Sequence, residues 1–154
     1  IVDEKKDLAS IENAKKYFTL IINNYPDTEY SLDSTFKIDL INDVLASKEM
    51  YIGRYYFEKK KWIAAINRFR TVVDTYDTTI YVEEALHRLV ELHFKLGLID
   101  ESKKYASLLG YNYQSSEWYE ESYKILNKNY VKTAKKVDPE KERSILQKFK
   151  DLLK

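Results

Sequence analysis

Cysteine is absent from this chain of 154 residues, and glycine and proline are scarce. Without thiols the protein can form no disulfide, no thiolate nucleophile and no sulfur-bound zinc site. Only three glycines and two prolines are present, which disfavours a sheet-rich fold with many tight turns. The formal net charge is +1, so no overall field draws the molecule toward nucleic acid.

Long apolar runs are also missing, since nowhere do about 18 apolar residues follow one another. The first residue is Ile1, and no signal-like apolar run follows it. We therefore expect the chain as given to be soluble and to be a fragment of a longer protein. On this expectation, any targeting segment or lipid anchor of the parent protein would lie upstream of Ile1.

The chain does contain one helical face that occurs three times. Each set has six members, spaced so that they fall on one stripe of a helix. The second set lies 51 residues after the first, and the third lies 37 residues after the second. The sets are Ile11, Ala14, Phe18, Ile21, Ile22 and Tyr25; Trp62, Ala65, Phe69, Val72, Val73 and Tyr76; and Ile99, Ser102, Ala106, Leu109, Gly110 and Tyr113.

Each set is followed by residues that end a helix and cap the next one. The first is followed by Pro26-Asp27-Thr28, and the others by runs of Asp, Thr, Gln and Ser. Each repeat is therefore a helix, a turn and the start of another helix. A recurrence of this kind, with a period near 35 residues, is typical of a solenoid of stacked helix pairs.

The spacing predicts one solenoid over residues 1–154. The region from Ser31 to Lys60 contains no proline and keeps a nearly continuous apolar register, which predicts a single helix of about 45 Å. The predicted parts are a partial repeat helix and turn over 1–30, a long shared helix over 31–60, the second helix of the next repeat over 61–77, a third helix pair over 79–110 and C-terminal helices over 117–154.

Four residues resemble the tetratricopeptide repeat signature. Gly53 and Ala65 are small enough to let two helices approach closely, while Tyr56 and Phe69 fill the space between them. We therefore expect an all-α fold, a right-handed tetratricopeptide-repeat solenoid of antiparallel helix pairs with one long shared helix.

Several longer segments are similar to the BamD family, also called ComL or YfiO, of tetratricopeptide lipoproteins. The similarity extends from about Asp7 to Leu126. The segments that carry it are 48–56 (KEMYIGRYY), 62–70 (WIAAINRFR), 82–89 (VEEALHRL) and 116–119 (SEWY).

The resemblance implies a non-catalytic scaffold subunit of the outer-membrane β-barrel assembly (BAM) complex. It implies docking to the periplasmic POTRA region of BamA at the periplasmic face of the outer membrane. Other lipoproteins of the complex and unfolded outer-membrane proteins are further implied partners, whereas nucleic acid is not. The membrane would be reached only through an N-terminal lipid anchor that is absent from this sequence, and no cofactor is implied.

The resemblance also implies a docking site on the helix that begins at Trp62. In the family, the arginine of an Asn-Arg pair on this helix is associated with an acidic residue of the barrel-proximal POTRA domain. The matching residues are Asn67 and Arg68, and we expect Arg68 on the flank of the helix with Asn67 and Trp62 near the contact. A guanidinium suits this role because its planar fork can bind a carboxylate twice. The alternative, a solvated surface arginine, stays open.

Residues that could carry chemistry are few. His87 and His93 lie six residues apart, whereas a two-histidine metal site on one helix needs a spacing of three or four. We expect no metal site, a surface His87 and a core-facing His93. Carboxylates occur in pairs on polar helical faces, so no catalytic residues are predicted and the protein is expected not to be an enzyme.

Two further expectations complete the interpretation. Tyr25, Tyr76 and Tyr113 end the three repeated faces and are predicted to be core residues. A new helix is predicted to begin at Asp138-Pro139-Glu140, after a lysine-rich stretch. The alternative function is a generic tetratricopeptide adaptor that binds extended peptides in the periplasm, although the lysines and asparagines of such a clamp cannot be assembled from these positions.

Overall fold

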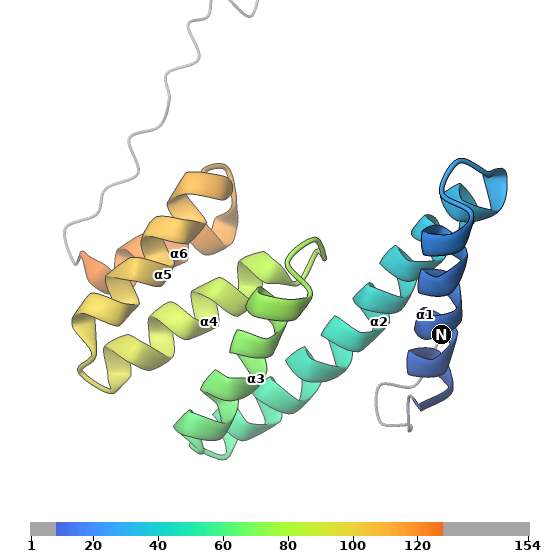
Figure 1. Cartoon of the computed structure of the whole chain (residues 1–154). Coiled ribbons are helices and arrows are strands. Elements are labelled where there is room, and N and C mark those ends of the chain that lie inside the picture. Colours follow the sequence, from blue (N-terminus) through green and yellow to red (C-terminus); the bar gives the residue numbers. More distant parts are fainter. Residues whose placement is uncertain (1–8, 128–154) are drawn as a thin grey trace, which may run out of the picture.

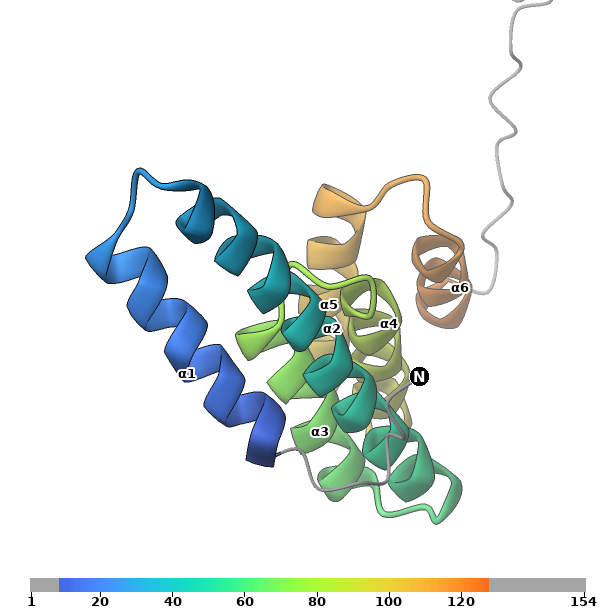
Figure 2. The same ribbon diagram turned by 90° about the vertical axis from the view of Figure 1, so that its right-hand side faces the viewer.

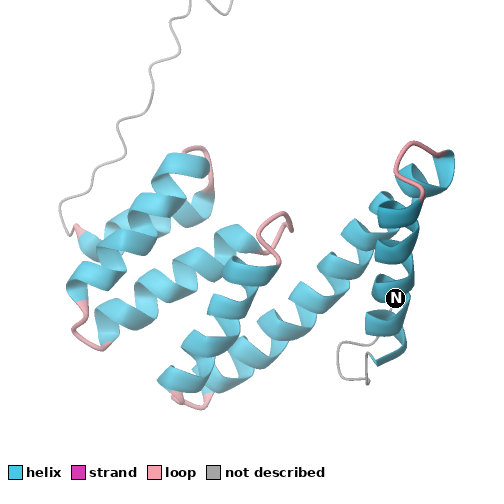
Figure 3. Cartoon of the chain, in the orientation of Figure 1, coloured by secondary structure: helices cyan, strands magenta, loops and turns pink. Residues whose placement is uncertain are grey.

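The computed structural model describes residues 9–127, which form helices joined by short connections (Figures 1 and 3). No strand occurs in this part of the chain, so the predicted all-α class is confirmed. The predicted helix at Asp138-Pro139-Glu140 lies outside the described residues. The helices are α1 (Ala9–Asn24), α2 (Glu29–Glu58), α3 (Trp62–Thr75), α4 (Val82–Lys95), α5 (Ile99–Asn112) and α6 (Glu117–Leu126).

Consecutive helices pack against one another in a tetratricopeptide-like arrangement, and α6 packs on both α4 and α5 (Figure 2). The long helix α2 serves two of these pairs. Asn42 in its first half accepts a hydrogen bond from Lys15 of α1, while Gly53 in its second half lies against Phe69 of α3. One helix therefore closes one pair and opens the next, as the proline-free stretch predicts.

The α2–α3 pair is held by a close contact between a glycine and a phenylalanine. Phe69 is completely buried, and so are its neighbours Ala65 and Val72 on the same face of α3. A Cβ atom added to Gly53 would lie 2.7 Å from a ring carbon of Phe69, which is closer than real Cβ atoms approach. The absence of a side chain at Gly53 thus sets how closely the two helices pack, as the repeat signature indicates.

The α4–α5 turn is closed by a glycine in the left-handed region. Gly97 has φ 76°, its amide donates to the Phe94 carbonyl, and the Leu98 amide donates to the His93 carbonyl at 2.9 Å. This pair of bonds satisfies the last carbonyls of α4. The α2–α3 turn uses the same pattern, with Lys60 at φ 56° in the left-handed position.

Burial is uneven along the chain, and this corrects one prediction about the tyrosines. Tyr76 and Tyr113 pack against the core as expected. Tyr25 does not, because 61% of its surface is exposed. Tyr76 lies at the end of α3, where Lys15 of α1 covers its ring, whereas no third helix among residues 9–127 covers the corresponding end of α1. None of residues 10–24 of α1 is fully buried.

Candidate partner-binding surface

Arg68 lies on the flank of α3, where the burial of the next residue places it. Because Phe69 is fixed in the core, the preceding side chain is rotated by about 100° to the edge of the helix. Its side chain is 42% exposed, and its Nη1 donates to Glu49 of α2 at 3.1 Å. Glu49 is 18% exposed. Arg68 is thus half-buried and held by an acid of its own chain.

The geometry of this pair leaves part of the guanidinium available. Both recorded contacts with Glu49, at 3.1 and 3.4 Å, use the same nitrogen, Nη1. Nη2 and Nε have no hydrogen-bond partner among the described residues. Two neighbouring N–H groups can bind one carboxylate bidentately. Arg68 can therefore stay paired with Glu49 and still bind a second acid from outside.

The other two predicted contact residues face different surroundings. The Trp62 ring packs edge-on against Phe57 at 5.6 Å between centroids, and Lys95 Nζ of α4 lies 5.4 Å from the Trp62 ring. Asn67 is exposed, and its backbone carbonyl accepts a bond from Thr71. Among the described contacts none joins Trp62 to Arg68, so the structure brings Arg68 to Glu49 but does not gather all three residues in one cluster.

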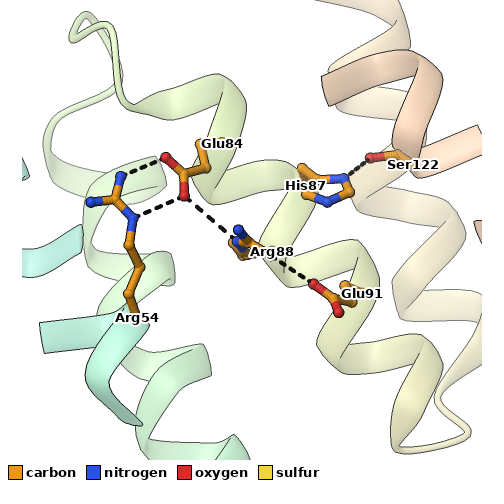
Figure 4. Close-up of polar contacts among 6 residues, drawn as sticks. All are labelled: Arg54, Glu84, His87, Arg88, Glu91 and Ser122. Carbon is orange, nitrogen blue, oxygen red and sulfur yellow. Dashed lines mark hydrogen bonds and ion pairs between the residues drawn. The ribbon is translucent and has the colours of Figure 1, made fainter. Parts of the chain in front are cut away.

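A ladder of ion pairs joins α2 to α4 and was not predicted (Figure 4). Arg54 donates to both oxygens of Glu84 at 2.6 and 2.9 Å, and Arg88 Nε lies 3.6 Å from Glu84. Arg88 and Lys95 each bind Glu91, at 3.0 and 2.8 Å. Burial raises the pKa of both carboxyls, but the bonds and charges of these cations outweigh it and leave each pKa below its usual value. The ladder is a structural link between neighbouring repeats.

Comparison with known sequences assigns this arrangement to a family. A sequence model of the YfiO family, described as outer membrane lipoprotein, matches residues 1–109, which is more than half of the chain.

The chain belongs to the YfiO family.

Several relatives of this YfiO-family chain are named outer membrane protein assembly factor BamD. The one from Rickettsia prowazekii is 52% identical over 130 residues, which cover 84% of this chain and 51% of the relative. The one from Caulobacter vibrioides is 43% identical over 134 residues, covering 87% and 44%. A third, from Neisseria meningitidis, is 33% identical over 92 residues, covering 60% and 34%. The chain thus spans about half or less of the length of these curated relatives.

Both histidines of this YfiO-family chain are buried, which corrects one prediction. His93 faces the core as expected, and its Nδ1 lies 2.7 Å from the Leu89 carbonyl oxygen. His87 was predicted at the surface, but only 6% of it is exposed. Its Nδ1 lies 2.9 Å from Ser122 Oγ of α6 (Figure 4). The Trp118 ring also packs beside it, at 5.1 Å between ring centroids. The prediction was wrong because α6, which is distant in sequence, covers this part of α4.

The burial of His87 predicts a pH dependence of stability. Burial, and then the charge of Arg88, lower the pKa of His87 below its ordinary 6.5. Above about pH 6.5 the His87 ring is neutral in both the folded and the unfolded state, so protonation of this residue does not reduce the free energy of unfolding. As the pH falls below this value, His87 becomes protonated in the unfolded state before it does so in the folded state, and the free energy of unfolding decreases.

We expect the urea midpoint to fall between about pH 7.5 and about pH 5.5, and to fall less in the His87→Gln variant. This window lies above the pH at which Glu84 and Glu91 lose their charge, so those carboxylates do not contribute to it. An identical pH dependence in the wild type and in His87→Gln would contradict the assignment to His87.

Residues 9–127 contain neither a cluster suited to a metal ion nor a helix suited to crossing a membrane. Among residues 9–127, no group of three or more histidine, aspartate and glutamate side chains is arranged to hold a metal ion. In the same part of the chain, none of the helices combines the length and the apolar character that crossing a bilayer requires.

Proposed function

We propose that this chain is a non-catalytic scaffold of the outer-membrane β-barrel assembly machinery, working at the periplasmic face of the outer membrane. In this role it docks to the barrel-proximal POTRA domain of BamA. Membership of a lipoprotein family supports attachment of the parent protein to the membrane by a lipid anchor. The names of the relatives, outer membrane protein assembly factors, support the process.

The observation that best supports the docking site is that Arg68 is half-exposed on the flank of α3. Its Nη1 is occupied by Glu49, whereas its other nitrogens are available to an acid of the partner. Exposed Asn67 precedes it on α3, and Trp62 begins the same helix. An arginine that is already held in position loses less freedom when a partner binds, which favours its use at an interface.

The experiment that tests this function is calorimetric titration of the chain with the isolated barrel-proximal POTRA domain of the cognate BamA. We expect one domain to bind per chain. A different POTRA domain of the same BamA is the matched control, and we expect it to bind at least about tenfold more weakly. Equal binding of the two domains would favour the generic adaptor, and no binding of either would contradict docking through this chain.

A further inference from the structure

A groove lies between α1, α2 and the C-terminal end of α3. Its volume is about 540 Å³. Its apolar surface comes from Leu20 of α1, Leu45 of α2 and Tyr76, the residue that follows α3. The polar groups along it are Glu12, Lys15, Lys16 and Thr19 of α1. None of the residues that line this groove belongs to the ion-pair ladder.

The walls of the groove are fixed by contacts within the chain. Lys15 donates to Asn42 of α2 at 2.7 Å, and its Nζ also lies 5.6 Å from the centroid of the Tyr76 ring. Leu45 is buried at the bottom, whereas 54% of Leu20 is exposed at the side. An apolar side chain that enters the groove would therefore cover Leu20 without displacing Leu45 from the core.

The groove is continuous with the Arg68–Glu49 pair. Tyr76 follows the last residue of α3 and lies about 12 Å beyond Arg68 along the helix axis, rotated about 80° toward the face of buried Phe69. Along α2, Glu49 lies one turn after Leu45. Glu49 is also close enough to raise the pKa of Tyr76, after the larger effect of burial. The groove and the pair are the two ends of one surface.

The net charge of the groove and the Arg68–Glu49 pair together indicates which kind of partner this surface fits. Its cations are Lys15, Lys16 and Arg68, and its anions are Glu12 and Glu49, so one positive charge is in excess. If a second copy of the chain bound here through the same surface, two surfaces of the same positive charge would face each other and repel. An acidic partner would instead neutralise the excess charge. The surface therefore fits a partner segment that carries both a carboxylate and a large apolar side chain.

We propose that the α1–α3 groove receives a large apolar side chain from the same partner whose carboxylate pairs with Arg68. The two partner groups are separated by about 12 Å along the axis of α3, which is the rise from Arg68 to Tyr76. This inference rests on the proposed function and extends the docking surface from α3 onto α1. Burial of the partner's apolar side chain contributes to affinity, and the pairing of its carboxylate with Arg68 fixes the position and orientation of the partner on this chain.

The test compares two leucine-to-glutamate variants in the full chain. Leu20→Glu introduces a charge into the groove. Leu32→Glu makes the same change at a leucine of α2 that does not line the groove and is similarly exposed, at 61% against 54% for Leu20. We expect affinity for the barrel-proximal POTRA domain to fall at least about tenfold in Leu20→Glu and to change less than about twofold in Leu32→Glu.

A second variant and a folding check make the outcome specific. Leu20→Ala shortens the side chain without adding charge, and we expect a loss of about threefold to tenfold. Urea unfolding of each variant shows whether it is folded at the temperature of the titration. If Leu20→Ala and Leu20→Glu both bind as tightly as the wild type, the groove proposal is wrong and docking at Arg68 stands. If the wild type does not bind, the proposed function fails and the groove proposal fails with it.

Discussion

Replacing Phe69 with alanine is expected to lower the free energy of unfolding by about 3 to 5 kcal/mol. The ring is completely buried and fills the space that Gly53 leaves open between α2 and α3. Because Gly53 has no side chain to move into the vacated volume, the substitution leaves a cavity as well as a loss of buried apolar surface. Urea unfolding followed by far-ultraviolet circular dichroism measures the change.

Ile63 supplies the control for this measurement on the same helix. It is 63% exposed, so Ile63→Ala changes helix α3 without opening the core. We expect its effect to stay within about 0.5 kcal/mol. A loss smaller than about 1 kcal/mol for Phe69→Ala would mean that the α2–α3 contact is not the centre of the fold.

Reversing the charge of Arg68 is expected to weaken binding to the barrel-proximal POTRA domain by about 2 to 5 kcal/mol. This corresponds to a decrease in affinity of about thirtyfold to several thousandfold. We expect the loss of binding free energy to be large for two reasons. The partner's carboxylate would lose its bidentate donor, and it would face a like charge in a contact from which water is excluded. Calorimetric titration of wild type and Arg68→Glu side by side measures the difference.

The pairing with Glu49 requires a control that the sequence does not suggest. In Arg68→Glu the new carboxylate would face Glu49, and this repulsion could disturb α3 on its own. The double variant Glu49→Gln with Arg68→Glu removes the repulsion but not the reversed charge. We expect it to bind as weakly as the single variant. Restored binding in the double variant would mean that the repulsion, and not a lost contact with the partner, caused the defect.

The helices and the contact of Gly53 with Phe69 could be predicted from sequence because both follow from local patterns. The repeated apolar spacing places Phe69 and Ala65 on the buried face of α3, and proline-free residues 31–60 contain one unbroken helix up to Glu58. Gly53 opposite Phe69 is recognisable from residue size. Each of these inferences needs only residues within one or two turns, or a known pairing of adjacent helices.

The partners of Arg68 and His87 could not be predicted because they depend on how separate helices meet. Glu49 lies 19 residues before Arg68, and Ser122 lies 35 residues after His87. The contact of Gly53 with Phe69 does contain a signal for the first pair, since it brings the preceding turn of α2 close to Arg68. No such contact can be recognised between α6 and α4, so the sequence gives no sign that His87 is buried.

The shallow burial of α1 has a consequence for the dynamics of the molecule. Because no described side chain of residues 10–24 is fully buried, separating this helix from α2 exposes less apolar surface than opening the α2–α3 pair. We therefore expect amide hydrogens of α1 to exchange with solvent through local opening, at a free energy well below that of global unfolding. We expect a ligand that bridges α1 and α3 to suppress this opening, so that part of its binding free energy is used to order α1.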